Sequence, residues 1–234
     1  MTFNSRRIER LETTPSTMWI AAQLAREGCP TGTIVIADTQ TAGMGRHGRT
    51  WHSQSGNGLY ASFVLRLGLP IHQLPVTMLA LGLAARDAIA ETTGLSPDLR
   101  WPNDVLIDSR KCAGILAQLE GDAVIAGIGI NVSQTDFPPD LNTPATSLLL
   151  EGSRVSRENL LVALAHSIDF HCALTAPDIL TRFTAASSYV RGRRVRTESQ
   201  IEGVTQGLDP SGFLIVREDN GRETTILAGG VRPV

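Results

Sequence analysis

A long, polar, glycine-rich segment lies between two apolar runs in the first third of the chain, and it restricts the fold more than any other feature. The runs, Thr33–Ala37 and Leu59–Leu67, have the composition of buried β-strands. Residues 39–58 between them are too many for a turn, and long loops in compact domains are commonly functional. The chain is therefore expected to build a sheet from which a functional loop extends between two strands.

Within this segment, Gly43–Gly48 has the GxGxxG spacing found in dinucleotide-binding folds. That fingerprint requires a helix that begins inside it and an acidic residue about 20 positions later, which binds the ribose. Residues 49–58 are instead loop-like, and no Asp or Glu occurs between Asp38 and Asp87. The chain also has no G-K-S/T sequence. The glycines therefore indicate neither a Rossmann fold nor a P-loop.

The chemistry of the loop suits an anion. Its glycines expose backbone N–H groups, and Arg46 and Arg49 offer bidentate donors with no carboxylate nearby in the sequence. A flexible surface loop with solvated arginines is the alternative. Trp51 favours a binding role, since an aromatic ring beside these arginines could close over a base or another ring system. A mobile loop that orders around a charged, water-sensitive intermediate fits this composition.

Lys111 is the only lysine in the chain, and every other basic residue counted with it is arginine. A general bias toward arginine explains most of this depletion, but it does not explain why one lysine is kept. An ammonium is a compact point charge that fits where a planar guanidinium does not. Lys111 is therefore a candidate functional residue before any motif is considered.

The apolar pattern and the turn signals divide the rest of the chain into two regions. Four helices are predicted: Met18–Glu27, Leu74–Thr93, a helix from the capping residue Ser156 to about Leu174, and about Pro177–Ala185. Four strands are predicted between the second and third helices: Asp98–Trp101, Val105–Asp108, Cys112–Leu119 and Ala123–Val132. After Ser188 only short strands separated by strong turn signals follow: Arg193–Thr197, Ile201–Gly207, Phe213–Arg217 and Thr224–Leu227. We therefore expect an α+β fold with a larger domain, residues 1–186, and a small β-barrel domain, residues 187–234.

The composition excludes several functional classes. A hydrophobic fraction of 42% and a charged fraction of 19% are ordinary for a globular protein, and a net charge of −2 argues against non-specific binding to nucleic acid. No apolar run is long enough to span a membrane, and residues 1–12 lack the apolar core of a signal peptide. The three cysteines show no CxxC spacing, which indicates reduced thiols in a cytoplasmic protein rather than disulfides or a zinc site.

Five motifs, in this order along the chain, resemble those of biotin–protein ligases. Ser16-Thr17 resembles the S-T-N at the start of their first helix, and Gln40–Trp51 is similar to their GRGRxGRxW adenylate loop. The other three are Arg100–Asp104, similar to K/R-W-P-N-D; Lys111–Leu116, similar to KxxGIL; and Gly127–Val132, similar to GIGIN. Because order and spacing agree from Ser16 to Asn131, the resemblance is specific and covers most of the chain.

The resemblance implies a class II aminoacyl-tRNA-synthetase-like catalytic domain with a mixed sheet, followed by a small SH3-like β-barrel. It implies a ligase that uses ATP and Mg²⁺ to convert biotin to biotinyl-5′-AMP and then transfers biotin to a lysine of a carboxylase's biotin carrier domain. It further implies a cytoplasmic protein that binds neither nucleic acid nor membrane, and it is compatible with a homodimer. Since about a dozen residues precede the first motif, the short form without an N-terminal DNA-binding domain is expected.

The same resemblance assigns roles to individual residues. Catalysis would depend on Lys111 and Arg46, because a carboxylate that attacks ATP brings two anions together and fixed cations lower that barrier. The residues expected to bind biotin are Ser16, Thr17, Gln40, Gly43, Lys111, Gly114 and Ile115. Those expected to bind ATP or the adenylate are Arg46, Arg49, Trp51, Asn103 and Asn131, and Asp104 would bind Mg²⁺. Structural roles are the alternative for some of them, such as helix capping by Ser16 and Thr17 or a turn at Asn103-Asp104.

Two positions and the tail depart from the family pattern. Met18 and Met44 stand where the family usually has Asn and Arg, and Met44 removes one positive charge from the loop. Residues 228–234 lack the Glu and the final basic residue often found there, so the usual contact between the small domain and the nucleotide is not implied. Two other functions remain as alternatives: a lipoate or octanoate acyl ligase on the same fold, and a biotin-binding homologue without catalysis.

Overall fold

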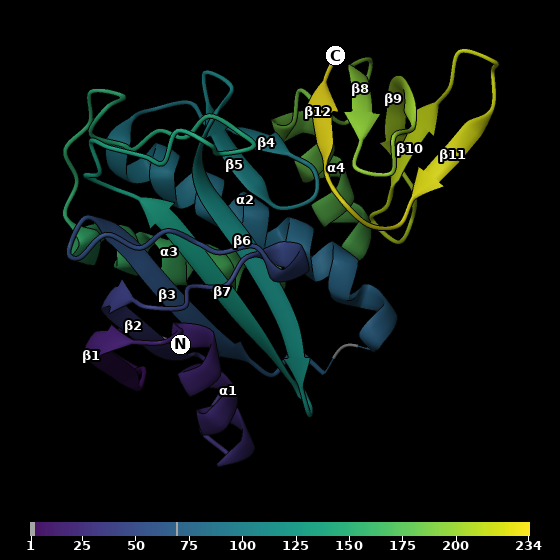
Figure 1. The fold of residues 1–234 in the computed structure, drawn as a ribbon. Helices are drawn as coiled ribbons and strands as arrows, with labels where there is room; N and C mark the ends of the chain where they lie inside the picture. The colour runs from purple at the N-terminus through teal and green to yellow at the C-terminus, as the bar shows by residue number, and fades with distance from the viewer. Residues whose placement is uncertain (1–2, 69) are drawn as a thin grey trace.

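Two β-sheets form the framework of the protein in the computed structural model, which describes residues 3–68 and 70–234 (Figure 1). The larger sheet has seven strands in the order β1-β2-β3-β7-β6-β5-β4. It is a mixed sheet, because β1 runs parallel to β2 and the other neighbours are antiparallel. Its strands are β1 Ile8–Thr14, β2 Thr33–Gln40, β3 Gly58–Leu65, β4 Asp98–Arg100, β5 Asp104–Ile107, β6 Arg110–Glu120 and β7 Ala123–Asn131.

Helices cover both faces of the larger sheet (Figure 1). On one face lies α1, whose Met18, Ala21 and Leu24 pack against the sheet, while α2 and α3 cover the opposite face. The helices are α1 Thr17–Arg26, α2 Leu74–Thr93, α3 Arg157–Cys172 and α4 Ala176–Ala186, with short 3-10 helices at Phe3–Ser5, Arg46–Gly48 and Ile71–Gln73. Among the residues that the structure describes, no helix is both long and apolar enough to cross a membrane.

The side chains of β3 and β7 alternate between two environments. Phe63 and Ile128 belong to the main apolar core, which α2 and α3 cover. On the α1 face, Ser62 of β3 pairs with Gly127 of β7, so the middle of this face carries small residues. Nearer the β6–β7 turn, the same face becomes apolar again where Val64 packs beneath α1. The sheet therefore leaves a shallow area of small residues beside α1, with room for a ligand.

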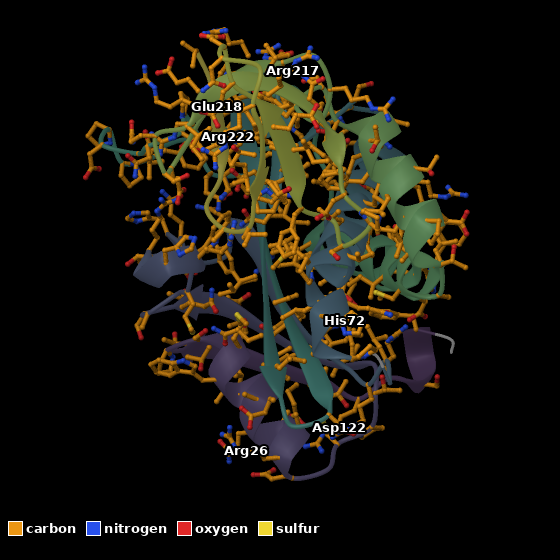
Figure 2. The ribbon with its side chains drawn as sticks, turned by 90° about the vertical axis from the view of Figure 1, so that its right-hand side faces the viewer. Arg26, His72, Asp122, Arg217, Glu218 and Arg222 are labelled. Atoms are coloured by element: carbon orange, nitrogen blue, oxygen red, sulfur yellow. The ribbon has the colours of Figure 1, made fainter. Side chains whose placement is uncertain are left out.

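The second sheet is antiparallel and has five strands in the order β11-β10-β9-β8-β12. They are β8 Arg194–Thr197, β9 Glu202–Leu208, β10 Leu214–Arg217, β11 Glu223–Ile226 and β12 Val231–Pro233. This sheet lies beside the β4–β5 turn and α2, since Nε1 of Trp101 donates to Gly212 O at 3.0 Å and a Cβ at Gly212 would lie 3.2 Å from Cδ1 of Leu79. Figure 2 shows its outer residues Arg217, Glu218 and Arg222 at the opposite end of the molecule from Asp122 of the β6–β7 turn.

The predicted α+β fold is confirmed, and each predicted helix and strand has a counterpart within a few residues. Two strands lie outside the prediction, β1 and β12. β1 is an edge strand whose side chains alternate poorly between buried and exposed, so its sequence carries little strand signal. The core is continuous across the two sheets, because Val195, Leu214 and Val231 belong to the same apolar cluster as α2. The boundary at residues 186 and 187 stays a prediction.

Candidate active site

A cavity of about 500 Å³ lies on the α1 face of the larger sheet, beneath the glycine-rich loop. Its wall includes the start of α1, Gln40, most of residues 44–54 and 100–104, parts of β6 and β7, most of residues 134–145, Glu198 and residues 230–232. All the residues predicted for the site are described, and only Gly43 lies outside this wall. Gly43 instead closes the base of the loop: its carbonyl accepts from Trp51 N at 2.9 Å, and a Cβ there would lie 2.5 Å from Trp51 O.

Glycines of β6 and β7 make the floor of the cavity. A Cβ at Gly129 would lie 2.4 Å from Cε2 of Trp51, and one at Gly114 would lie 2.8 Å from Cζ3 of the same ring. A Cβ at Gly127 would lie 2.6 Å from Sδ of the buried Met18. The indole of Trp51 therefore rests on the sheet, and Nε1 of this ring has no hydrogen-bond partner among the described residues. The floor anchors one end of the glycine-rich loop.

A cluster of short polar side chains lies where α1 begins. The parallel pairing of Thr14 with Gln40 brings the ends of β1 and β2 together, so the first turn of α1 meets Gln40. Thr17 donates to Oε1 of Gln40 from its backbone N at 2.8 Å and from Oγ1 at 3.0 Å. Oγ1 of Thr17 also lies 2.8 Å from Oγ of Ser62. Ser16 caps the helix by accepting from Met18 N at 3.3 Å.

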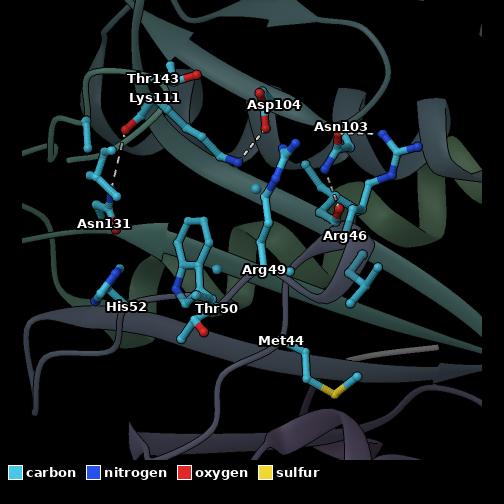
Figure 3. Close-up of a pocket in the computed structure, with 18 of the residues that line it drawn as sticks. Met44, Arg46, Arg49, Thr50, His52, Asn103, Asp104, Lys111, Asn131 and Thr143 are labelled. Atoms are coloured by element: carbon cyan, nitrogen blue, oxygen red, sulfur yellow. Dashed lines mark hydrogen bonds and ion pairs between the residues drawn. The ribbon is translucent and has the colours of Figure 1, made fainter. Parts of the chain in front are cut away.

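The ammonium of Lys111 is held by a carboxylate (Figure 3). Nζ of Lys111 lies 2.5 Å from Oδ1 of Asp104 and 5.5 Å from the centroid of the Trp51 ring. The other oxygen of Asp104, Oδ2, accepts from Nη2 of Arg100 at 2.5 Å. Burial would raise the pKa of Asp104, but the charges of Lys111 and Arg100 outweigh it and hold this pKa below its ordinary value. Asp104 is therefore ionised at neutral pH and fixes the amine beside the floor.

The two loop arginines both reach other parts of the chain. Nη1 of Arg46 donates to Oδ1 of Asn103 at 3.2 Å and to Gly229 O at 3.0 Å. Asn103 is itself fixed, since its Nδ2 donates to Ile115 O at 2.9 Å. Burial lowers the pKa of Arg46, although Glu198 and Asp104 partly offset this effect. Arg49 points to the second sheet, where its Nη2 donates to Oε1 of Glu198 at 2.8 Å.

Asn131 ties the end of β7 to the cavity wall. Its Nδ2 donates to Thr146 O at 2.9 Å and to Lys111 O at 3.4 Å. Residues 3–68 and 70–234 contain no group of three or more His, Cys, Asp or Glu side chains that could hold a metal. Both oxygens of Asp104 are bound to cations. These side chains therefore do not form a Mg²⁺ site by themselves, and the assignment of Asp104 to the ion stays a prediction.

Several wall residues were missed by the sequence analysis, and most lie in residues 134–145. Gln134 is buried; it donates to Oη of Tyr60 at 3.1 Å, and its own Oε1 has no partner in the described part of the chain. It follows the GIGIN-like motif by two residues, which is the one sequence signal that could have pointed to it. Arg100 and Glu198 were also missed. Arg100 meets Asp104 through the pairing of β4 with β5, whereas Glu198 meets Arg49 only through the packing of the second sheet against the loop.

Two family models match the chain. Residues 10–134 match the biotin/lipoate A/B protein ligase family, and residues 191–231 match the biotin protein ligase C terminal domain. The first match includes the polar cluster, the loop, Lys111 and Asn131, whereas the second includes Glu198 and Gly229.

Characterised relatives agree with these matches over most of the chain. The bifunctional ligase/repressor BirA of Bacillus subtilis is 36% identical over 220 residues, which are 88% of this chain and 68% of the relative. The biotin–[acetyl-CoA-carboxylase] ligase of Mycobacterium tuberculosis is 34% identical over 218 residues, 86% of this chain and 78% of the relative. The structure of the biotin protein ligase from Aquifex aeolicus in complex with biotin and ATP superposes with a TM-score of 0.86 at 30% identity, covering 97% of this chain and 99% of that one.

Proposed function

The chain belongs to the biotin/lipoate A/B protein ligase family, and from this membership we propose how its cavity carries out a two-step reaction. The protein is an ATP-dependent biotin–protein ligase, which activates biotin as biotinyl-5′-AMP and transfers it to a lysine of a carrier protein. The observation that carries the residue assignments is convergence: the lone amine of Lys111, the loop arginines and the polar cluster of α1 all line one cavity.

The polar cluster and the glycine floor suit the two ends of biotin. A ureido ring needs short donors and acceptors in an otherwise apolar pocket, and Ser16, Thr17 and Gln40 provide them. Gly114 and Ile115 would contribute backbone groups only, since Gly114 has no side chain and that of Ile115 lies in the core. Biotin is proposed to lie between this cluster and Lys111, beside the Trp51 ring that covers the floor.

The charges on the opposite side suit the activation step. A carboxylate oxygen of biotin bonds to the α-phosphorus of ATP, the bond from that phosphorus to pyrophosphate breaks, and two anions must approach each other. The ammonium of Lys111, positioned by Asp104, meets the developing negative charge. Arg46 would neutralise the phosphates, and Arg49 and Trp51 would belong to the loop that folds over the adenylate. Asn103 orients Arg46, and Asn131 holds the backbone carbonyl of Lys111.

The transfer step moves biotin from the adenylate to a lysine of the carrier protein. The neutral amine of the carrier lysine attacks the carbonyl carbon of the mixed anhydride, the bond from that carbon to the phosphate oxygen breaks, and AMP leaves. We propose that the carrier is a biotin carrier domain of a carboxylase and that the protein acts in the cytoplasm, as a monomer or a homodimer. Mg²⁺ is proposed to accompany ATP, and Asp104 alone would not hold it, because both oxygens of this carboxylate are paired with cations.

Exchange of pyrophosphate into ATP tests the proposed function directly. The protein should catalyse this exchange with biotin and not with lipoate or octanoate, and it should then label an added biotin carrier domain. Exchange that lipoate or octanoate alone supports would identify a different acyl ligase of the same family. Biotin binding measured by calorimetry, with neither exchange nor transfer, would identify a binding protein without catalysis.

A further inference from the structure

We infer that Glu198 of the second sheet is a positioning residue that holds the glycine-rich loop closed and so retains the acyl adenylate. The inference rests on the proposed function, because the ligand that the loop retains is the intermediate of that reaction. It concerns a residue outside all five motifs that the family resemblance depends on. Glu198 acts through Arg49 and has no proposed contact with the substrates.

Three contacts join the loop to the second sheet. Oε1 of Glu198 accepts from Nη2 of Arg49 at 2.8 Å, and Oε2 lies 4.0 Å from Nε2 of His47. The third contact is the hydrogen bond at 3.0 Å from Arg46 to the carbonyl of Gly229. Arg46, His47 and Arg49 lie within four residues of one another, so the second sheet holds this part of the loop.

The position of Glu198 is built into the second sheet. Glu198 follows β8 in a tight turn, where Gln200 N donates to Thr197 O at 3.0 Å, and its own backbone N donates to Gly230 O at 3.1 Å. Gly229 has a φ of 89° and a Cβ there would lie 3.1 Å from Cβ of Glu198, so a larger residue would crowd the acid. Gly229 therefore makes room for this carboxylate beside the loop.

The carboxylate of Glu198 balances the positive charge of the glycine-rich loop. Residues 39–58 contain arginines and histidines but no Asp or Glu, so the closed loop needs an anion from elsewhere. Burial would raise the pKa of Glu198, but Arg49, His47 and Arg46 outweigh this effect and lower it, so the side chain is ionised at neutral pH. Glu198 supplies the missing negative charge and leaves Arg46, which faces Asn103, available to the adenylate.

Loss of this contact should be seen as faster release of the intermediate. A charge-assisted hydrogen bond changes an equilibrium constant, here that of loop closure, by about tenfold. Solvent screens the pair because Arg49 is half exposed, so the expected factor is about threefold. Glu198→Gln should therefore release biotinyl-5′-AMP at least about threefold faster, while a single turnover of adenylate formation stays within about twofold of wild type. Released adenylate acylates free amines, so a bystander protein such as albumin should be labelled more.

The experiment compares Glu198→Gln with Glu202→Gln by chasing preformed radiolabelled adenylate with excess unlabelled biotin and ATP. Glu202 is a matched control, because it lies in the same sheet and its carboxylate pairs with Arg196, outside the cavity wall. Glu198→Asp keeps the charge but withdraws it by one methylene group, so its release rate should fall between wild type and Glu198→Gln. Thermal unfolding of all variants should match wild type.

Two negative outcomes have different meanings. If Glu198→Gln and Glu202→Gln release adenylate at the same rate, the positioning role of Glu198 is wrong while the ligase assignment stands. If wild-type protein forms no adenylate at all, the proposed function itself fails.

Discussion

Replacing Lys111 by arginine keeps a positive charge in the cavity but changes its shape. In the native structure Nζ lies 2.5 Å from Oδ1 of Asp104, and both Nζ and Cε would lie 3.0 Å from a Cβ at Gly114. The wider guanidinium does not fit between Asp104 and Gly114 without displacing the neighbouring Trp51 ring. Removing one fixed charge-stabilising group lowers a rate by about 10²–10³-fold, so we expect Lys111→Arg to slow adenylate formation by about 100-fold, which is about 2.7 kcal/mol in activation free energy.

Folding stability should change much less than the rate. The new arginine still faces Asp104, whose Oδ2 keeps its hydrogen bond to Arg100, so no buried carboxylate is left unpaired. We expect the free energy of unfolding, measured by urea titration, to fall by less than about 2 kcal/mol. Arg110→Lys is the matched control, because Arg110 is the next residue and pairs with Glu151 instead. A biotin-dependent pyrophosphate exchange rate in Lys111→Arg within about threefold of wild type would refute the role of Lys111.

Gly129→Ala should raise the KM values for biotin and ATP about tenfold, because its Cβ would lie 2.4 Å from Cε2 of Trp51 and displace the ring; unchanged steady-state kinetics would contradict this. Asp87→Asn should lower the urea midpoint most at neutral pH and progressively less below about pH 4. Burial raises the pKa of Asp87, but hydrogen bonds from His171 and a neighbouring arginine outweigh it, so its stabilisation is present above the unfolded-state pKa and lost as pH falls through the native one. A difference in urea midpoint between wild type and Asp87→Asn that stays the same at every pH would show that reasoning to be wrong. The wild-type enzyme should label itself poorly with biotin and ATP, because its only side-chain amine, on Lys111, is held in an ion pair; several biotins per chain in intact-mass spectra would argue against this.

The elements that sequence predicts well here are those whose signals are local. The capping residue Ser16 predicts the start of the first helix, and Gly94, which has a φ of 73°, predicts the end of the second. Gly121 predicts the turn of the β6–β7 hairpin, and its φ of 59° suits that turn. β1 escapes prediction because it is stabilised by parallel pairing with β2 at the edge of the sheet, and this pairing is not visible in a polar sequence such as Ile8–Thr14.

The site shows the same division between local and long-range information. The sequence singles out Lys111 by its chemistry, but its pairing with Asp104 depends on an irregularity between Val105 and Leu106, where the register of β5 and β6 shifts. No spacing rule gives that shift. Glu198 is further from prediction, since it lies about 150 residues from Arg49 in the sequence and meets it only through the packing of two sheets.

The glycine-rich loop contacts both sheets, and each sheet requires a different kind of side chain from it: an aromatic ring on the larger sheet and arginines on the second. Trp51 needs glycines beneath it, because a flat ring can lie on β6 and β7 only where no Cβ intervenes. Arg49 and Arg46 need acceptors on the second sheet, which Glu198 and the carbonyl of Gly229 provide. The closed loop can form only when the two sheets hold their mutual position. Contacts between the sheets that never touch a substrate are therefore expected to contribute to retention of the intermediate as well as to stability.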